Sequence, residues 1–105
     1  VDVYAIFGNA LDNAIESVSK VPEPEKRLIA VSVWSRSGRL LIQVENYFEG
    51  TLAFADGLPV PSKEDKDYHG FGIKSIRYAV EKYDGCMGIY PENNLFLLRI
   101  SIPIP

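Results

Sequence analysis

The strongest constraint on the fold is a change of hydrophobic period that occurs twice along the chain. Residues 2–20 carry apolar side chains at helical spacing, whereas residues 28–46 alternate between apolar and polar positions, as strands do. The same order returns after residue 70, where a helical segment precedes two strand-like segments. This order predicts an α+β two-layer sandwich, with helices on one face of a mixed, mostly antiparallel sheet.

The first helix is predicted from Asp2 to Lys20, capped by Asp2 and ended by the prolines that follow. Its polar face carries two asparagines one turn apart, Asn9 and Asn13. Because asparagine competes with the helix backbone for hydrogen bonds, a solvated face normally uses Glu, Lys or Gln. The amides are therefore candidate ligands, and the alternative is a solvated face that happens to use asparagine. The predicted core face consists of Val3, Phe7, Ala10, Leu11, Ala14, Ile15 and Val18.

Two hairpins are predicted, over residues 28–46 and over residues 86–104, and a long connection separates them. In the first hairpin a row of alternating apolar residues ends in Asn46, so an amide continues a row that should be buried. The connection, residues 47–69, is rich in Gly and Pro and lacks periodicity. A loop of this length in a small domain indicates a lid, a binding loop or a disordered segment.

Bulk properties limit the classes of function. The chain has 105 residues, 47% of them hydrophobic, and a net charge of −3, which predicts one globular domain. The charges are mixed, so a nucleic-acid or polybasic membrane surface is not indicated. The single cysteine, Cys86, is expected to be a small buried hydrophobe in a reducing, cytoplasmic setting. Because the chain opens with Val1, we expect it to be an N-terminally truncated piece of a longer protein.

Several residue types could bind a nucleotide. The segment Gly70-Phe71-Gly72 precedes a helix and could cradle phosphate, with Lys74 nearby, although a plain turn is the alternative. Asn13, with Asn9, could bind Mg²⁺ through an amide oxygen.

The remaining candidates are two polar residues. Asn46 could read an adenine edge, since an amide both donates and accepts, or it could simply end a strand. His69, the single histidine, has no orienting partner that the sequence identifies, and a loop residue that caps the next helix is the alternative.

Together these segments resemble the GHKL ATPases, which include gyrase, heat-shock chaperones, histidine kinases and mismatch-repair proteins. "GNALDNAIES" is similar to their N box, and "HGFGIKSIRYAVEKYDG" is similar to their glycine-rich G2 box. Between them, "LLIQVENYFEG" takes the G1 position, where most members have Asp-x-Gly-x-Gly. Here Asn46 replaces the Asp and Phe48 replaces the first Gly. This departure resembles the peptide-quorum-sensing branch of sensor histidine kinases, the AgrC- and ComD-like proteins.

The resemblance implies a Bergerat fold that binds ATP and Mg²⁺, with a role for each matching residue. Asn13 would ligate Mg²⁺. Asn9 lies where gyrase-type members carry a Glu that activates water, and an amide cannot act as that base. Asn46 would contact adenine. The phosphates would be wrapped by the glycine-rich segment, Gly70, Phe71 and Gly72, with His69 before it and Lys74 after it. Lys63 would add a contact from the lid.

The implied function is the ATP-binding catalytic domain of a sensor histidine kinase, over residues 1–105. This domain would pass phosphate to a histidine on a dimerisation domain that the chain lacks, and a response regulator would act downstream. The full-length protein would be a membrane-anchored homodimer with this domain in the cytoplasm. Two alternatives stay open: a nucleotide-binding regulatory domain without transfer activity, and an interaction domain that binds no nucleotide.

Overall fold

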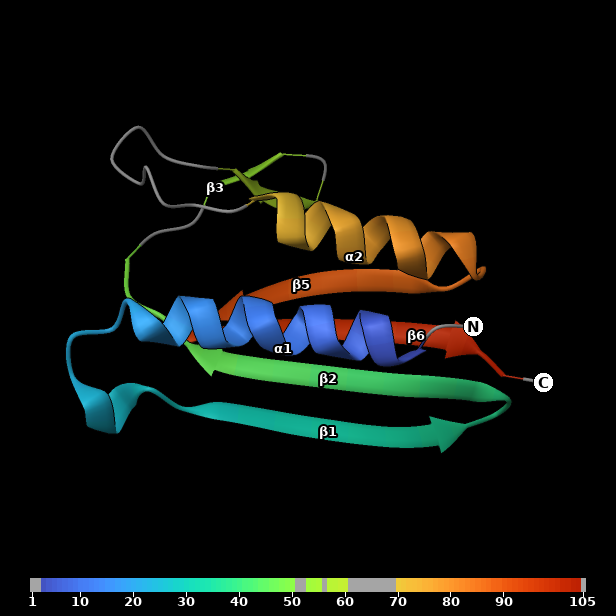
Figure 1. Ribbon diagram of the computed structural model, residues 1–105, viewed down its shortest axis with the longest axis horizontal. Helices are drawn as coiled ribbons and strands as arrows, with labels where there is room; N and C mark the ends of the chain where they lie inside the picture. Colours follow the sequence, from blue (N-terminus) through green and yellow to red (C-terminus); the bar gives the residue numbers. More distant parts are fainter. Residues whose placement is uncertain (1–2, 51–52, 56, 61–69, 105) are drawn as a thin grey trace.

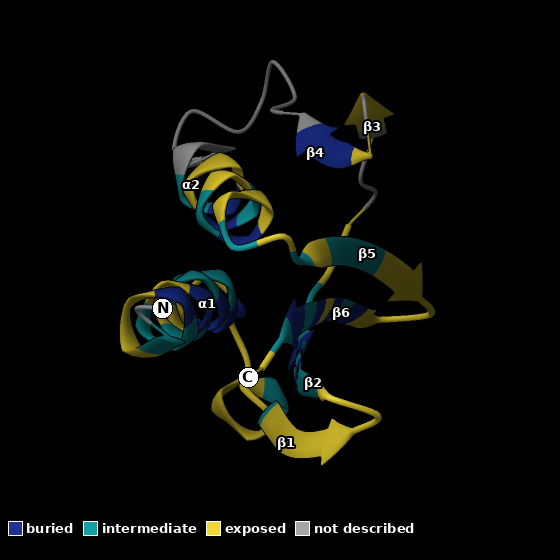
Figure 2. Cartoon of the chain, turned by 90° about the vertical axis from the view of Figure 1, so that its right-hand side faces the viewer, coloured by how far each residue is buried: buried dark blue, intermediate teal, exposed yellow. Residues whose placement is uncertain are grey.

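The computed structural model describes residues 3–50, 53–55, 57–60 and 70–104. Two helices cover one face of a four-stranded sheet, and a short hairpin lies beside the second helix (Figures 1 and 2). In the part of the chain that the structure describes, no helix is long and apolar enough to cross a membrane. The elements are α1 (Val3–Ser19), a 3₁₀ turn (Pro24–Lys26), β1 (Ile29–Arg36), β2 (Arg39–Tyr47), β3 (Ala53–Ala55), β4 (Leu58–Val60), α2 (Gly70–Lys82), β5 (Cys86–Glu92) and β6 (Leu95–Pro103).

The main sheet has the strand order β1-β2-β6-β5. We expected a mixed, mostly antiparallel sheet, and every ladder between the described strands is antiparallel. Ser37 and Gly38, which join β1 to β2, both have positive φ, at 52° and 76°. Positive φ at both central residues matches the right-handed twist of paired strands, so this two-residue loop sets the register of the hairpin.

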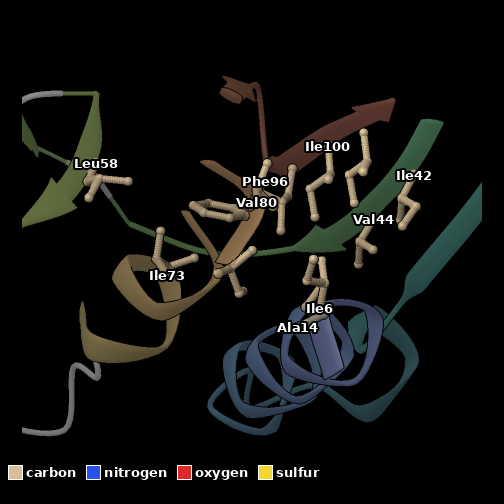
Figure 3. Close-up of a cluster of buried hydrophobic side chains, with 13 residues drawn as sticks. Ile6, Ala14, Ile42, Val44, Leu58, Ile73, Val80, Phe96 and Ile100 are labelled. Atoms are coloured by element: carbon tan, nitrogen blue, oxygen red, sulfur yellow. The ribbon is translucent and has the colours of Figure 1, made fainter. Parts of the chain in front are cut away.

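The core lies between the helices and the two central strands. β2 and β6 bury alternate residues, so that each contributes one row of side chains to the helix-facing side. In α2 the buried row is Ile73, Ile76 and Val80, as its helical spacing predicts. Figure 3 shows Ile6 and Ala14 pointing from α1 toward the sheet. Burial of this apolar surface, at about 25 cal/mol per Å², is the main force that holds the two layers together.

The core face of α1 differs from the predicted one. The buried residues are Ile6, Ala10, Ala14 and Val18, whereas Ile15 is 53% exposed. Because α1 packs against α2 as well as against β2, its buried row differs from the one predicted and includes Ile6. Ile15 therefore remains on the outer flank of the helix.

Part of the long connection is ordered, contrary to the prediction of an aperiodic loop. β3 and β4 pair antiparallel, and Leu58 of β4 is buried in the core cluster beside α2. Strands of three residues are too short to show a period in sequence. Of the lid that we predicted over residues 50–68, positions 51–52, 56 and 61–68 lie outside the described residues.

Asp84 and Gly85 end α2, and each does so for a different reason. The N–H of Gly85 donates to the carbonyl of Val80 at 2.9 Å, and the N–H of Asp84 donates to that of Glu81 at 3.0 Å. This pair of bonds is a Schellman motif, and its left-handed residue is Asp84, with φ 61°, not the glycine. Gly85 is required for space, because a Cβ there would lie 2.6 Å from the carbonyl oxygen of Ser101.

Cys86 is exposed, so the prediction of a buried thiol was wrong. It pairs with Ser101 across the ladder, on the face of the sheet away from the helices, whereas its neighbour Met87 packs against the core. Successive side chains of a strand point to opposite faces of the sheet, so the thiol of Cys86 faces away from the helices when Met87 faces them.

Candidate functional site

The N-terminal end of α2 meets the middle of α1 at Asn13. A Cβ placed on Gly72 would lie 3.9 Å from Oδ1 of Asn13, so the amide faces the first turn of α2. The two segments are 59 positions apart in sequence (72 − 13), and packing of α1 against α2 brings them together. Asn9 lies one turn earlier on α1, about 40° around the helix from Asn13, and is exposed.

The first turn of α2 is suited to an anion. The first four N–H groups of a helix have no acceptor within the helix, and the helix dipole places partial positive charge there. The first turn of α2 contains no acidic residue that would oppose an anion. A glycine at position 72 leaves the backbone open on the side that faces Asn13. An amide oxygen and a set of N–H donors therefore lie next to each other.

Asn46 is the one buried polar residue among those that the structure describes, with 2% of its surface exposed. It ends the helix-facing row of β2, and Phe96 is its partner on β6. Its Nδ2 donates to Oγ of Ser17 at 2.9 Å and to the carbonyl oxygen of Tyr47 at 3.1 Å. Burial without these bonds would cost about 1–3 kcal/mol, so the two acceptors account for the presence of an amide at this position.

Ser17 was not predicted as a site residue. It lies one turn after Asn13 on α1 and connects this helix to the end of β2. One feature of the sequence pointed to Ser17: it continues the four-residue spacing of Asn9 and Asn13. Such spacing places all three on one side of a helix.

Phe48 has a structural role that explains its place in the chain. Its ring makes an edge-to-face contact with Phe96, with centroids 6.4 Å apart at 88°, and it packs against the core. Its N–H donates to the carbonyl of Asn94 at 3.0 Å, and Nδ2 of Asn94 donates to its carbonyl at 3.2 Å. The chain beyond β2 is therefore anchored to the β5–β6 hairpin next to Asn46.

Tyr47 anchors the other side of the same strand end. The ammonium of Lys26 lies 5.9 Å from the centroid of the Tyr47 ring, which is a cation–π contact. Lys26 also donates to Glu23 at 3.3 Å, and this hydrogen bond is the main cause of a raised pKa of Lys26. Because Lys26 stays charged at neutral pH, it keeps this contact with the ring.

The other predicted site residues divide into two groups. Gly70 begins α2, and Lys74 is exposed at its fifth residue, about 200° around the helix from Gly72. Lys74 therefore lies in the second turn and on the side of the helix away from Asn13. Lys63 and His69 lie outside the described residues. Phe71 is in the first turn of α2.

The comparison with protein families gives a clear assignment. A model described as "GHKL domain" matches residues 1–103 of the 105. The chain belongs to the GHKL family. A search of curated proteins finds no match for this GHKL domain.

Among solved structures, the domain is similar to Acinetobacter baumannii histidine kinase AdeS, with a TM-score of 0.60 and 12% sequence identity. The match covers 95% of this chain and 46% of that one, so this GHKL domain spans about half the length of the kinase chain. At this identity the likeness concerns the fold, the helix-covered antiparallel sheet described above.

Proposed function

We propose that this GHKL domain is the ATP-binding catalytic domain of a sensor histidine kinase, which holds Mg-ATP for phosphoryl transfer to a histidine elsewhere in the full protein. The observation that carries the proposal is the meeting of Asn13 with the first turn of α2, while the buried Asn46 is bonded to Ser17, one turn further along α1. Membership in the GHKL family and the fold shared with a histidine kinase support it.

The donor set fits magnesium bound together with phosphate. Mg²⁺ prefers oxygen ligands, retains water and commonly uses one or two protein oxygens plus substrate phosphates. In the described residues no cluster of three His, Cys, Asp or Glu side chains could hold a metal alone. Oδ1 of Asn13 would supply the protein oxygen, and Asn9 would help to place the ion. The metal would neutralise charge on the phosphates.

The chain's own residues would bind and orient the rest of the nucleotide. The N–H groups of Gly70, Phe71 and Gly72 would donate to phosphate oxygens, while Lys74 would add positive charge at longer range. Lys63 and His69 complete the proposed set on the segment before α2. Phosphoryl transfer depends mainly on such positioning and charge stabilisation. Asn9 cannot act as a general base, which favours a histidine over water as the acceptor.

The setting of the domain follows from the same proposal. The acceptor histidine would lie on a dimerisation domain, a response regulator would receive the phosphate, and the full protein would be a homodimer anchored in the cell membrane. The segment Asn46-Tyr47-Phe48-Glu49-Gly50 supports the peptide-quorum-sensing branch. In this structure Phe48 contributes to packing, so its presence in place of glycine does not remove the support of the strand end.

A thermal-shift series tests nucleotide binding. Mg-ATP and Mg-ADP should raise the melting temperature, because a ligand at 100 times its Kd stabilises the folded state by about 2.7 kcal/mol. A flat response to Mg-ATP, Mg-ADP and Mg-GTP would reject the proposal in favour of an interaction domain. Binding without autophosphorylation of the full protein would instead favour a regulatory domain.

A further inference from the structure

The orientation of the Asn46 amide is decided by its two contacts. Nδ2 lies 3.1 Å from the carbonyl oxygen of Tyr47, a group that accepts hydrogen bonds and cannot donate one. An amide turned by 180° would place two acceptors against each other. The atom that faces Tyr47 and Ser17 is therefore the nitrogen.

Both hydrogens of the amide are used in this arrangement, one by Ser17 and one by Tyr47. The hydrogen bonds found for the Asn46 side chain among the described residues both use Nδ2, and none uses Oδ1. No fully buried side-chain oxygen in this part of the chain lacks a partner, so Oδ1 is not fully covered and can accept a bond from a ligand. The group that Asn46 offers is an acceptor, although an asparagine in isolation could offer either function.

We propose that Ser17 is a positioning residue that sets the base selectivity of the site, an inference that rests on the proposed nucleotide binding. Its hydroxyl holds the Asn46 amide so that Oδ1 accepts a hydrogen bond from the 6-amino group of adenine. The 6-oxo group of guanine would meet the same oxygen as a second acceptor, so GTP binds more weakly. A carboxylate at this position would accept with either oxygen and would need no such orientation.

Loss of the Ser17 hydroxyl releases one of the two bonds that orient the amide. The bond to Tyr47 remains, so the preference for the adenine-facing orientation is reduced, not abolished. One neutral hydrogen bond corresponds to a change of about two- to tenfold in an equilibrium. Ser17→Ala should therefore lower the ratio of ATP to GTP affinity by about two- to tenfold.

The test is calorimetric titration of the full chain with Mg-ATP and with Mg-GTP. Ser17→Thr keeps a hydroxyl and should restore the ratio. Ser19→Ala is the matched control, because Ser19 is on the same helix but its hydroxyl bonds to the carbonyl of Glu16, at 2.6 Å, on the exposed side. This control should leave the ratio at the wild-type value.

A second background separates orientation from simple packing. In Asn46→Asp both side-chain oxygens accept, so the loss of the Ser17 hydroxyl should no longer change the ATP-to-GTP ratio. An unchanged ratio in Ser17→Ala, with a lower melting temperature, would reduce Ser17 to a structural link between helix and sheet. An equal shift of the ratio in the Asn46→Asp background would also overturn the proposal.

The outcomes distinguish this inference from the proposed function. If wild type binds neither nucleotide, the proposed function fails and the selectivity role fails with it. If wild type binds ATP and the Ser17→Ala ratio is unchanged, only the inference fails. Side-chain amide NMR signals of Asn46 provide a readout without nucleotide: one of its two proton signals should shift in Ser17→Ala and not in Ser19→Ala.

Discussion

α1 and α2 lie side by side on the same face of the sheet (Figure 2). Their outer faces differ in composition. Each helix buries one apolar row in a shared core. Outside that row α2 carries an Arg77–Glu81 ion pair at 3.5 Å. The polar face of α1 also carries charged residues, Asp12 and Glu16, but Asn9 and Asn13 lie among them. Charged pairs at this spacing stabilise a helix, and asparagines do not. The proposed function assigns binding to these two asparagines.

The buried rows of α1 and α2 should contribute equally to stability, and truncations in them should cause the largest losses in the free energy of unfolding. Ile6 and Ile76 are 1% and 0% exposed, one in each helix. Truncation of either to alanine removes buried methyl groups and leaves a cavity, so we expect a loss of about 2–5 kcal/mol in the free energy of unfolding. Urea unfolding of the two variants measures it. A loss below about 1 kcal/mol in only one of them would show that the helices do not share one core.

The polar faces should behave oppositely toward nucleotide. Asn13→Ala removes the proposed magnesium ligand from a position outside the core, so the fold should remain. Losing a bond to a charged group costs about 1.5–3 kcal/mol, which corresponds to roughly ten- to a hundredfold in Mg-ATP affinity. Titration calorimetry with magnesium present gives this affinity. Unchanged binding would remove Asn13 from the site.

The comparison also shows what sequence can predict. Both helices and both long hairpins follow from local periodicity, and Asn46 was predictable because it ends an alternating row on β2. Ile6 was missed because the buried face of α1 depends on α2 as well as on the sheet. The partner of Asn46 was missed for a related reason: Ser17 is 29 residues away, and only the packing of α1 on β2 brings the two together.

Local sequence rules did not predict how Asp84 and Gly85 divide their roles at the end of α2. The sequence Asp84-Gly85 predicts a glycine in the left-handed conformation, but Asp84 takes it. Aspartate tolerates positive φ better than most residues. The glycine is needed instead for close approach to Ser101, a contact on β6 that no local pattern reveals.

Substitutions of Asp84 and Gly85 should have effects of intermediate size on stability. Gly85→Ala forces a Cβ to within 2.6 Å of the Ser101 carbonyl oxygen, so the backbone must shift. We expect a loss of about 1–3 kcal/mol, as for other overpacked sites. Asp84→Gly should change stability by about 1 kcal/mol or less, because glycine relieves the positive φ but adds freedom to the unfolded chain. Thermal unfolding of the two variants decides it, and a larger effect at position 84 would reverse our assignment.

The smallest effect is expected on the outer face of α2. Glu81→Gln removes the ion pair with Arg77, and we change the acidic partner because Arg77 makes a further contact. Pairs at this spacing contribute about 0.2–0.5 kcal/mol, and salt screens them. The variant should lose at most that amount in urea unfolding, with a smaller difference at high salt, and its Mg-ATP affinity should equal that of wild type. A drop in affinity like that expected for Asn13→Ala would mean that both helices present binding surfaces. The contrast between α1 and α2 would then be one of composition and not of function.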